Sequence, residues 1–183
     1  MERIVKLVWP AEEYLPQYVA ALERGWSPNN LRPVAAAEEL AQIAADGAAF
    51  LASLVDRHPR GKTVTMPDGS TVPRLPGYRK WMWDGEFCGS ISFRWQHGTE
   101  ALPPYCLGHI GYGVVPERRR QGYGYEAAAG LRDWAFGQPG VERMTGDCWS
   151  DNIASARILE KLGMRSVGTL DSGLQLWQME RPS

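Results

Sequence analysis

Alternating hydrophobic and polar residues mark several strands along the chain. The clearest case is residues 87–95, whose two alternating sets are Phe87, Gly89, Ile91, Phe93 and Trp95, and Cys88, Ser90, Ser92 and Arg94. Successive side chains of a strand point to opposite faces, so this pattern predicts a strand with its aromatic residues on one face. Comparable patterns predict strands over residues 4–9, 78–83, 107–115, 143–149, 165–170 and 174–179.

Helical patterns fall between these strands. Apolar residues at helical spacing, and stretches rich in Ala, Leu and Glu, predict helices over residues 10–24, 35–55, 123–136 and 152–162. Gly25 and Gly163 follow two of these helices, in the position that a helix C-terminus favours. Gly47 lies inside the second helix, and we expect it to divide that helix into two pieces.

The order of the predicted elements is typical of a mixed α/β fold. A small extra hairpin is expected where residues 63–66 and 70–72 flank the turn sequence Pro67-Asp68-Gly69. Without that hairpin the order is β-α-α-β-β-β-α-β-α-β-β, which indicates one layer of strands with helices on both faces. No repeat, linker or low-complexity tract interrupts the pattern, so we expect a single domain over residues 1–183.

Composition narrows the function classes. The chain has 183 residues with 20 basic and 21 acidic side chains, a net charge of −1 that gives no general reason to bind nucleic acid or an anionic membrane. No apolar stretch is long enough for a membrane span, and the charged start is not a secretory signal. The three cysteines are scattered and share no ligand spacing with the three histidines, so we expect a cytoplasmic protein without a metal site.

The candidate chemistry lies in residues 114–126, with the sequence VVPERRRQGYGYE. A predicted strand leads into a basic, glycine-bearing turn, and the turn leads into a helix. Backbone N–H groups of such a turn converge on anions, and the helix N-terminus adds positive potential. Gly122 and Gly124 allow close approach of the backbone, and Arg118 to Arg120 supply charge for phosphates. The pattern therefore indicates a diphosphate ligand.

Three interpretations of this turn compete. Gly122-x-Gly124-x-x-Ala127 matches a dinucleotide fingerprint, although six residues separate it from the strand and the neighbouring strands look antiparallel. A nucleotide P-loop at Gly61-Lys62-Thr63 fails, because Asp56 occupies the position of the required earlier glycine. The third interpretation is a coenzyme A pyrophosphate loop of the form Arg/Gln-x-x-Gly-x-Gly/Ala, and residues 119–124 fit it at every fixed position.

At this point the sequence resembles the GNAT superfamily of acyl-CoA-dependent N-acyltransferases, most closely a bacterial subgroup of predicted acetyltransferases. Residues 108–114 (GHIGYGV) are similar to the family's central strand, and residues 89–94 (GSISFR) to the strand before it. Residues 151–164 (DNIASARILEKLGM) are similar to its second signature, Asn-x-x-Ser followed by a helix that ends in Lys-Leu-Gly-hydrophobic. The resemblance implies a mostly antiparallel sheet of about seven strands, splayed at the central strand, with helices on both faces.

The resemblance also implies where acetyl-CoA binds. In this family the pantetheine arm inserts beside the central strand, where backbone groups of Tyr112, Val114 and Val115 would pair with it. Asn152 and Ser155 share one helix face and would contact the arm or the acyl group. The N–H groups that would hold the pyrophosphate belong to Arg119, Arg120, Gln121, Gly122, Tyr123 and Gly124.

The implied reaction is direct attack of a primary amine on the acetyl thioester in a ternary complex, with a small-molecule or peptide amine as acceptor. Many family members have a Tyr as acid where this chain has Leu159, and some have a Glu as base where it has Gly108. We therefore expect His109 as the base. For the acid we expect Ser155 or a nearby Tyr, with departure of an unprotonated thiolate as the alternative. Because of these departures, a non-catalytic module that senses acyl-CoA is an alternative function. Because of the glycine pattern, a dinucleotide-binding enzyme is a second alternative. The pattern favours no oligomeric state.

Overall fold

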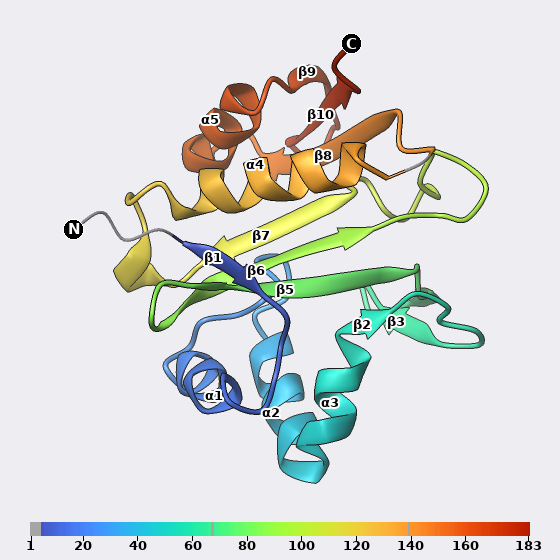
Figure 1. Ribbon diagram of the computed structural model, residues 1–183. Helices are drawn as coiled ribbons and strands as arrows, with labels where there is room; N and C mark the ends of the chain where they lie inside the picture. The colour runs from blue at the N-terminus through green and yellow to red at the C-terminus, as the bar shows by residue number, and fades with distance from the viewer. Residues whose placement is uncertain (1–4, 67, 139) are drawn as a thin grey trace.

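The structure is a computed structural model that describes residues 5–66, 68–138 and 140–183. Strands form a central layer, with α1, α2 and α3 on one face and α4 and α5 on the other (Figure 1). In chain order the elements are β1 (Lys6–Val8), α1 (Leu15–Glu23), α2 (Ala35–Ala45), α3 (Gly47–Ser53), β2 (Val55–Asp56), β3 (Thr63–Thr65), β4 (Thr71–Pro73), β5 (Gly77–Trp83), β6 (Phe87–Arg94), β7 (Ile110–Val114), the 3₁₀ helix η1 (Pro116–Arg118), α4 (Tyr123–Phe136), β8 (Arg143–Trp149), α5 (Ile153–Lys161), β9 (Arg165–Thr169) and β10 (Leu174–Glu180).

The strand layer consists of two antiparallel sheets. The first has the order β1-β5-β6-β7, with β2 also paired to β5, and the second has the order β8-β10-β9. The two sheets are joined where the His109 N–H donates to the Thr145 carbonyl over 2.9 Å. β7 and β8 themselves belong to different sheets. The predicted mixed α/β fold is confirmed, and the expected seven strands correspond to β1 and β5 to β10.

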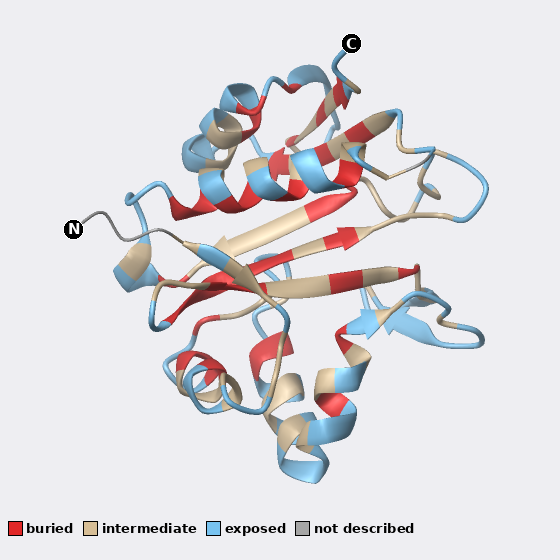
Figure 2. Cartoon of the chain, viewed as in Figure 1, coloured by how far each residue is buried: buried red, intermediate tan, exposed pale blue. Residues whose placement is uncertain are grey.

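A hydrophobic core lies on each side of the layer (Figure 2). One packs between the sheets and α4 and α5, and includes Met82, Ile91, Phe93, Ile110 and Met144. The other packs between the first sheet and α1 to α3, and includes Tyr18, Trp26, Phe50, Trp81 and Val115. Helices with one apolar face and a sheet with two apolar faces produce this three-layer arrangement.

The predicted face of Phe87 is wrong, because β6 contains a bulge. The pairing of β5 and β6 shifts by one residue between Met82 and Trp83, so Phe87 faces α1 while Ile91 and Phe93 face α4. Gly89 lies at the bulge with φ +150°, and a Cβ there would stand 2.2 Å from the carbonyl oxygen of Gly113. Only glycine fits this approach, and the bulge reverses the alternation on which the prediction depended.

One predicted helix boundary differs from the structure, and one predicted helix break is confirmed. The first helix begins at Leu15 rather than residue 10, with Pro16 in its first turn, where a missing N–H is tolerated. The second region divides next to Gly47, as expected: Asp46 is extended, and its carboxylate accepts from the Ala49 N–H over 2.9 Å and begins α3. Residue 4 of the first predicted strand, and Pro67 of the predicted turn, lie outside the described residues.

Candidate functional site: the turn before α4 and the edge of β7

The basic turn between β7 and α4 has an unusual backbone. After η1, Arg119 is extended, Arg120 has φ +62° and Gly122 has φ +87°. Within the described part of the chain, Arg120 is the only residue other than glycine with positive φ. A non-glycine residue held in this region is strained, and such strain concentrates at binding sites.

This backbone leaves a run of amide donors at the start of α4. The first hydrogen bond of the helix runs from the Glu126 N–H to the Gly122 carbonyl over 3.0 Å. For residues 120–125, no backbone N–H has an acceptor among the described residues. Unpaired N–H groups at a helix N-terminus, reinforced by the helix dipole, form an anion-binding site. The donor set therefore fits a pyrophosphate, as the sequence predicts for Arg120, Gln121, Gly122, Tyr123 and Gly124.

Side chains anchor the turn to the sheet. The buried Tyr123 hydroxyl donates to Asp84 Oδ2 over 2.7 Å, and Arg118 Nη2 lies 3.6 Å from Asp84 Oδ1 and also pairs with Glu86. Burial raises the pKa of Asp84, but these partners outweigh burial and hold the pKa below its usual value. Arg118 is thus neutralised within the protein, so Arg119 and Arg120 carry the positive charge offered to a phosphate.

Gly124 serves packing. A Cβ at Gly124 would stand 3.0 Å from Ile158 Cδ1 and 3.6 Å from Val114 Cγ2, so glycine lets α4 approach both α5 and β7. Because η1 separates the strand from the helix and the neighbouring strands are antiparallel, the dinucleotide interpretation of Gly122-x-Gly124-x-x-Ala127 does not fit the structure.

The edge of β7 next to β8 presents backbone groups that no neighbouring strand pairs, although the Val114 carbonyl accepts from Arg119 Nε. The Arg94 N–H donates to the His109 carbonyl, and the Val115 N–H donates to the Cys88 carbonyl. These two bonds set the alternation of the antiparallel ladder, so the N–H and C=O groups of Tyr112 and Val114 point away from β6. An extended chain can pair with such an edge as an added strand.

Two predicted ligand contacts need correction. The Val115 N–H is bonded to Cys88, and its carbonyl accepts from the Arg118 N–H over 3.0 Å, because the chain turns into η1 there. The Arg119 N–H donates to the Pro116 carbonyl over 3.3 Å in the same 3₁₀ turn. The Arg119 side chain remains near the site, since its Nε donates to the Val114 carbonyl over 3.2 Å.

Tyr112 and Ser155 meet across the gap between the two sheets. Tyr112 Oη lies 2.9 Å from Ser155 Oγ, and the carboxamide oxygen of Asn152 caps α5 by accepting from the Ser155 N–H over 3.1 Å. Burial raises the pKa of Tyr112 to about 12, although the Ser155 hydrogen bond acts in the opposite direction. Tyr112 is therefore a protonated donor at neutral pH. Leu159, by contrast, is buried beside Gly146 in the core.

His109 holds the two sheets together. Its Nδ1 accepts from the Thr145 N–H over 3.0 Å and lies 2.8 Å from Thr145 Oγ1, and its ring is buried. Burial lowers the pKa of His109 to about 4, against the raising effect of a hydrogen bond with the Glu100 backbone. A buried ring whose Nδ1 is occupied cannot collect a proton from a bound amine, so the structure disagrees with the expectation that His109 is the base.

His109 should make folding stability depend on pH. Because its pKa is lower in the folded chain than the usual 6.5, the unfolded chain binds more protons below pH 6.5, and stability is lost as pH falls through about 4. We expect this side chain to contribute a loss of up to about 3 kcal/mol between pH 7 and pH 4. Urea unfolding at several pH values should show a shallower decline for His109→Gln. An equally steep decline would contradict this account.

The face of β7 toward α1 is lined by glycine, and neighbouring side chains occupy the space. Asp147 Oδ1 lies 2.6 Å from the Cβ position of Gly108, and Arg94 Nη2 lies 2.7 Å from that of Gly111. The Trp26 ring lies 3.7 Å from the Cβ position of Gly113.

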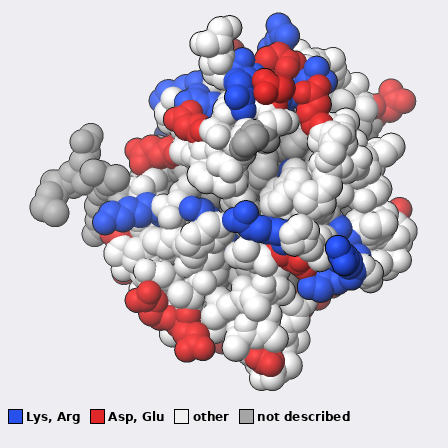
Figure 3. Space-filling view, turned by 45° about the vertical axis from the view of Figure 1, so that its right-hand side comes forward, with Lys and Arg blue, Asp and Glu red and all other residues white. Residues whose placement is uncertain are grey.

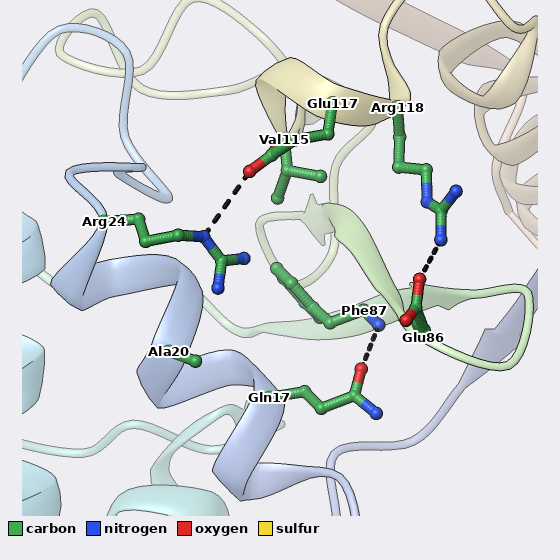
Figure 4. A pocket seen from close by; sticks show the side chains of 8 residues that line it. All are labelled: Gln17, Ala20, Arg24, Glu86, Phe87, Val115, Glu117 and Arg118. Carbon is green, nitrogen blue, oxygen red and sulfur yellow. Dashed lines mark hydrogen bonds and ion pairs between the residues drawn. The ribbon is translucent and has the colours of Figure 1, made fainter.

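A separate pocket of about 350 Å³ lies between α1, the β5–β6 turn and η1 (Figure 4). Its charged side chains neutralise one another: Arg24 Nε lies 3.4 Å from Glu117 Oε1, and Arg118 pairs with Glu86. The Gln17 side chain accepts from the Phe87 N–H over 2.7 Å. This pocket offers no unpaired charge to a ligand, and it does not include the free donors of residues 120–125.

The described residues contain no group of three or more His, Cys, Asp or Glu side chains placed to hold a metal ion. No helix within residues 5–66, 68–138 and 140–183 is long and apolar enough to cross a membrane. On the face in Figure 3, basic and acidic side chains lie interspersed rather than in a field of one sign.

Sequence reasoning missed part of the site. It predicted backbone contacts for Tyr112 but not its side-chain bond to Ser155, and it gave Arg94 no role beyond its strand face. Asp147 showed one signal, a carboxylate near the end of a β-strand. Arg94 and Asp147 approach β7 from strands on either side of it, so no local pattern connects them.

Comparisons with known proteins agree with this geometry. The family model described as an acetyltransferase (GNAT) domain matches residues 29–165. The uncharacterized N-acetyltransferase YjdG of Bacillus subtilis strain 168 is 44% identical over 54 residues, which is 30% of this chain and 32% of that protein. The chain thus spans about a third of the length of this curated relative.

Solved structures share the fold at low identity. The microcin C7 self-immunity acetyltransferase MccE, in complex with acetyl-CoA and AMP, has a TM-score of 0.62 and 12% identity over 96% of this chain and 92% of that one. RimL, the ribosomal L7/L12 alpha-N-protein acetyltransferase, in complex with coenzyme A, has a TM-score of 0.63 and 13% identity over 96% and 93%. The family model covers most of the chain, and the chain belongs to the GNAT acetyltransferase family.

Proposed function

We propose that the chain is an N-acetyltransferase, a single domain over residues 1–183 that transfers the acetyl group of acetyl-CoA to a primary amine. The observation that carries this proposal is the run of unpaired N–H groups over residues 120–125, next to the open edge of β7. The first feature fits a pyrophosphate, and the second fits the extended arm that follows it in coenzyme A. MccE and RimL, which share the fold, are described with acetyl-CoA and coenzyme A, respectively.

The cysteines support direct transfer to the amine. A covalent acetyl-enzyme would need a reactive thiolate. Burial raises the pKa of Cys88 to about 12 and also raises the pKa of Cys106 and Cys148. These thiols are protonated at neutral pH, so the acceptor amine is the better nucleophile. We keep the expectation that the protein works in the cytoplasm, where its three free cysteines would stay reduced.

Tyr112 and Ser155 are placed to assist the leaving thiolate. The hydroxyl pair bridges β7 and α5 beside the open strand edge, where the arm would end. The Val114 N–H, which points to the same side, would stabilise the oxyanion of the tetrahedral intermediate. Tyr112 would thus be the nearby Tyr that acts as the acid, the role that Leu159 cannot fill, and Ser155 would be its hydrogen-bond partner.

Tyr112→Phe should lower kcat by roughly 10²-fold while acetyl-CoA affinity changes less than threefold, because the ring remains and only the donor is lost. Tyr125→Phe, on α4 under the Lys161 ammonium, is a matched control that should retain kcat. Steady-state thiol release and titration calorimetry measure the two quantities. Unchanged kcat in Tyr112→Phe would remove this residue from the reaction.

The alternative is a module that binds acyl-CoA without turnover. This alternative is favoured by Leu159, which stands where many family members have the acid Tyr. Thiol release from acetyl-CoA in the presence of an amine panel separates the two. Amine-dependent release supports the transferase, and tight acetyl-CoA binding without release for any amine supports the module.

A further inference from the structure

Arg94 and Asp147 carry opposite charges, and neither forms an ion pair among the described residues, although the Arg94 side chain hydrogen-bonds the Cys106 thiol. The Asp147 carboxylate is partly buried, and none of the described residues donates a hydrogen bond to it or forms an ion pair with it. The Arg94 guanidinium likewise forms no ion pair with any carboxylate of the described chain. Proteins rarely leave a partly buried charge unpaired unless a ligand completes it.

The two charges share one surface. Arg94 Nη2 lies 2.7 Å from the Cβ position of Gly111, on the face of β7 where Trp26 and Asn30 approach Gly113, and Asp147 Oδ1 lies 2.6 Å from the Cβ position of Gly108, two residues before β7. They influence one another electrostatically, yet no N···O distance between them is within the 4.0 Å of an ion pair among the described residues. A ligand that carries both charges, with its ammonium on Asp147 and its anionic group on Arg94, would bridge this gap.

The surface also lies opposite the proposed acetyl-CoA side. Tyr112 and Val114 side chains face α4 and α5, whereas positions 111 and 113 present only glycine hydrogens to the other face. An amine beside Gly111 and Gly113 would therefore meet no side chain of β7 itself, and Arg94 and Trp26 would border it. Trp26 and Asn30, from the segment after α1, border this surface near Gly113.

We propose that Arg94 and Asp147 form the acceptor site, that Arg94 binds a carboxylate of the acceptor, and that Asp147 takes the proton from its amine. The acceptor class is then an amino acid or a similar primary amine with a nearby carboxylate. This inference rests on the proposed transferase function. Arg94 presents a planar set of donors that matches a carboxylate, which lysine does not.

The acceptor ammonium gives one proton to the Asp147 carboxylate, and the freed lone pair forms the C–N bond to the thioester carbon. The C–S bond breaks, and its electron pair leaves on sulfur. The second proton lost by the nitrogen goes to the thiolate, and Asp147 releases its own proton to water. The products are the acetylated amine and the free thiol.

The surroundings of Asp147 suit a base. Burial raises its pKa, against the opposing Arg94 charge on β6. The other titratable groups that interact electrostatically with it are Cys106 before β7, Tyr112 on β7 and Cys148 on its own strand, and burial keeps these groups protonated at neutral pH. A carboxylate with a raised pKa is a stronger base than an exposed one.

The test compares amino acids with their decarboxylated amines and their amides, in acetyl-CoA thiol release by the full chain. We expect kcat/KM to be at least tenfold higher for the amino acids. Arg94→Gln should raise KM for amino acids at least tenfold and leave the decarboxylated amines within threefold. Arg143→Gln, which removes an exposed arginine that pairs with Glu180, is the matched control. Equal rates for amino acids and decarboxylated amines would overturn the role of Arg94.

Asp147→Asn should lower kcat roughly 10²-fold for every acceptor and leave acetyl-CoA affinity unchanged. Its melting temperature should stay level or rise, because the variant no longer buries a charge, whereas loss of a structural carboxylate would lower it. Asp133→Asn, at an exposed carboxylate on α4, is the control. Unchanged kcat would overturn the role of Asp147. Thiol release that no amine accelerates would overturn the transferase function itself, and this inference with it.

Discussion

Gly122→Asp is expected to weaken acetyl-CoA binding about 100-fold, or about 2.8 kcal/mol. Gly122 is the residue before α4, in the centre of the free N–H groups of residues 120–125. An aspartate there would accept hydrogen bonds from these donors and repel the phosphates. Aspartate tolerates the φ of +87° better than most residues, so the loss would come from the anion site rather than from unfolding. Titration calorimetry with acetyl-CoA measures it.

Gly69→Asp is the matched control. Gly69 has φ +84°, nothing lies within 4 Å of its Cβ position, and it belongs to the turn between β3 and β4. The Gly69→Asp substitution introduces the same charge and the same backbone constraint as Gly122→Asp, but away from α4. Its acetyl-CoA affinity should equal that of the unmodified chain. Equal affinities for both variants would mean that the turn before α4 is not the phosphate site.

Glu39→Ala should reduce the free energy of unfolding by about 3–5 kcal/mol. Arg79 Nη1 donates to Glu39 Oε1 over 2.9 Å and to the Tyr18 hydroxyl over 2.9 Å, and Tyr18 in turn donates to Glu39. Only 12% of the Glu39 side chain and 21% of the Arg79 side chain are exposed. Removal of the carboxylate leaves the guanidinium buried without its counter-charge. Urea unfolding measures the loss.

The neighbouring residue provides the control. Glu38 pairs with Arg32 over 2.7 Å, but 45% of its side chain is exposed, and Glu38→Ala should lose less than about 1 kcal/mol. The double variant Glu39→Ala/Arg79→Met should lose less than the sum of the two single changes, because no unpaired charge remains. Additive losses would show that the three side chains do not act as a unit. This cluster holds α1 and α2 on β5, and so positions Trp26 beside β7.

Local signals predicted the cofactor side of the site. Residues 114–126 contain the strand, the basic turn, the glycines and the helix N-terminus in succession. A local sequence pattern is therefore enough to predict an anion-binding turn there. Asn152 and Ser155 were predicted to share one helix face, and in the structure the Asn152 carboxamide accepts from the Ser155 N–H and caps α5.

Contacts between distant segments set the limits of prediction. Phe87 has the wrong predicted face because the bulge at Gly89 depends on the close approach of Gly113 from the next strand. His109 resembles a base in sequence, but Thr145 on β8 buries and occupies it. Alternation predicts which side of a strand a residue takes, and only the neighbouring strand determines what it meets there.

Titration calorimetry of the purified chain with acetyl-CoA, with CoA and NADH as comparators, tests the central claim most directly. The account predicts one acetyl-CoA site per chain, binding of CoA at the same site, and no heat from NADH. Absence of acetyl-CoA binding, or binding of NADH in its place, would contradict the assignment of residues 120–125 as a coenzyme A pyrophosphate site.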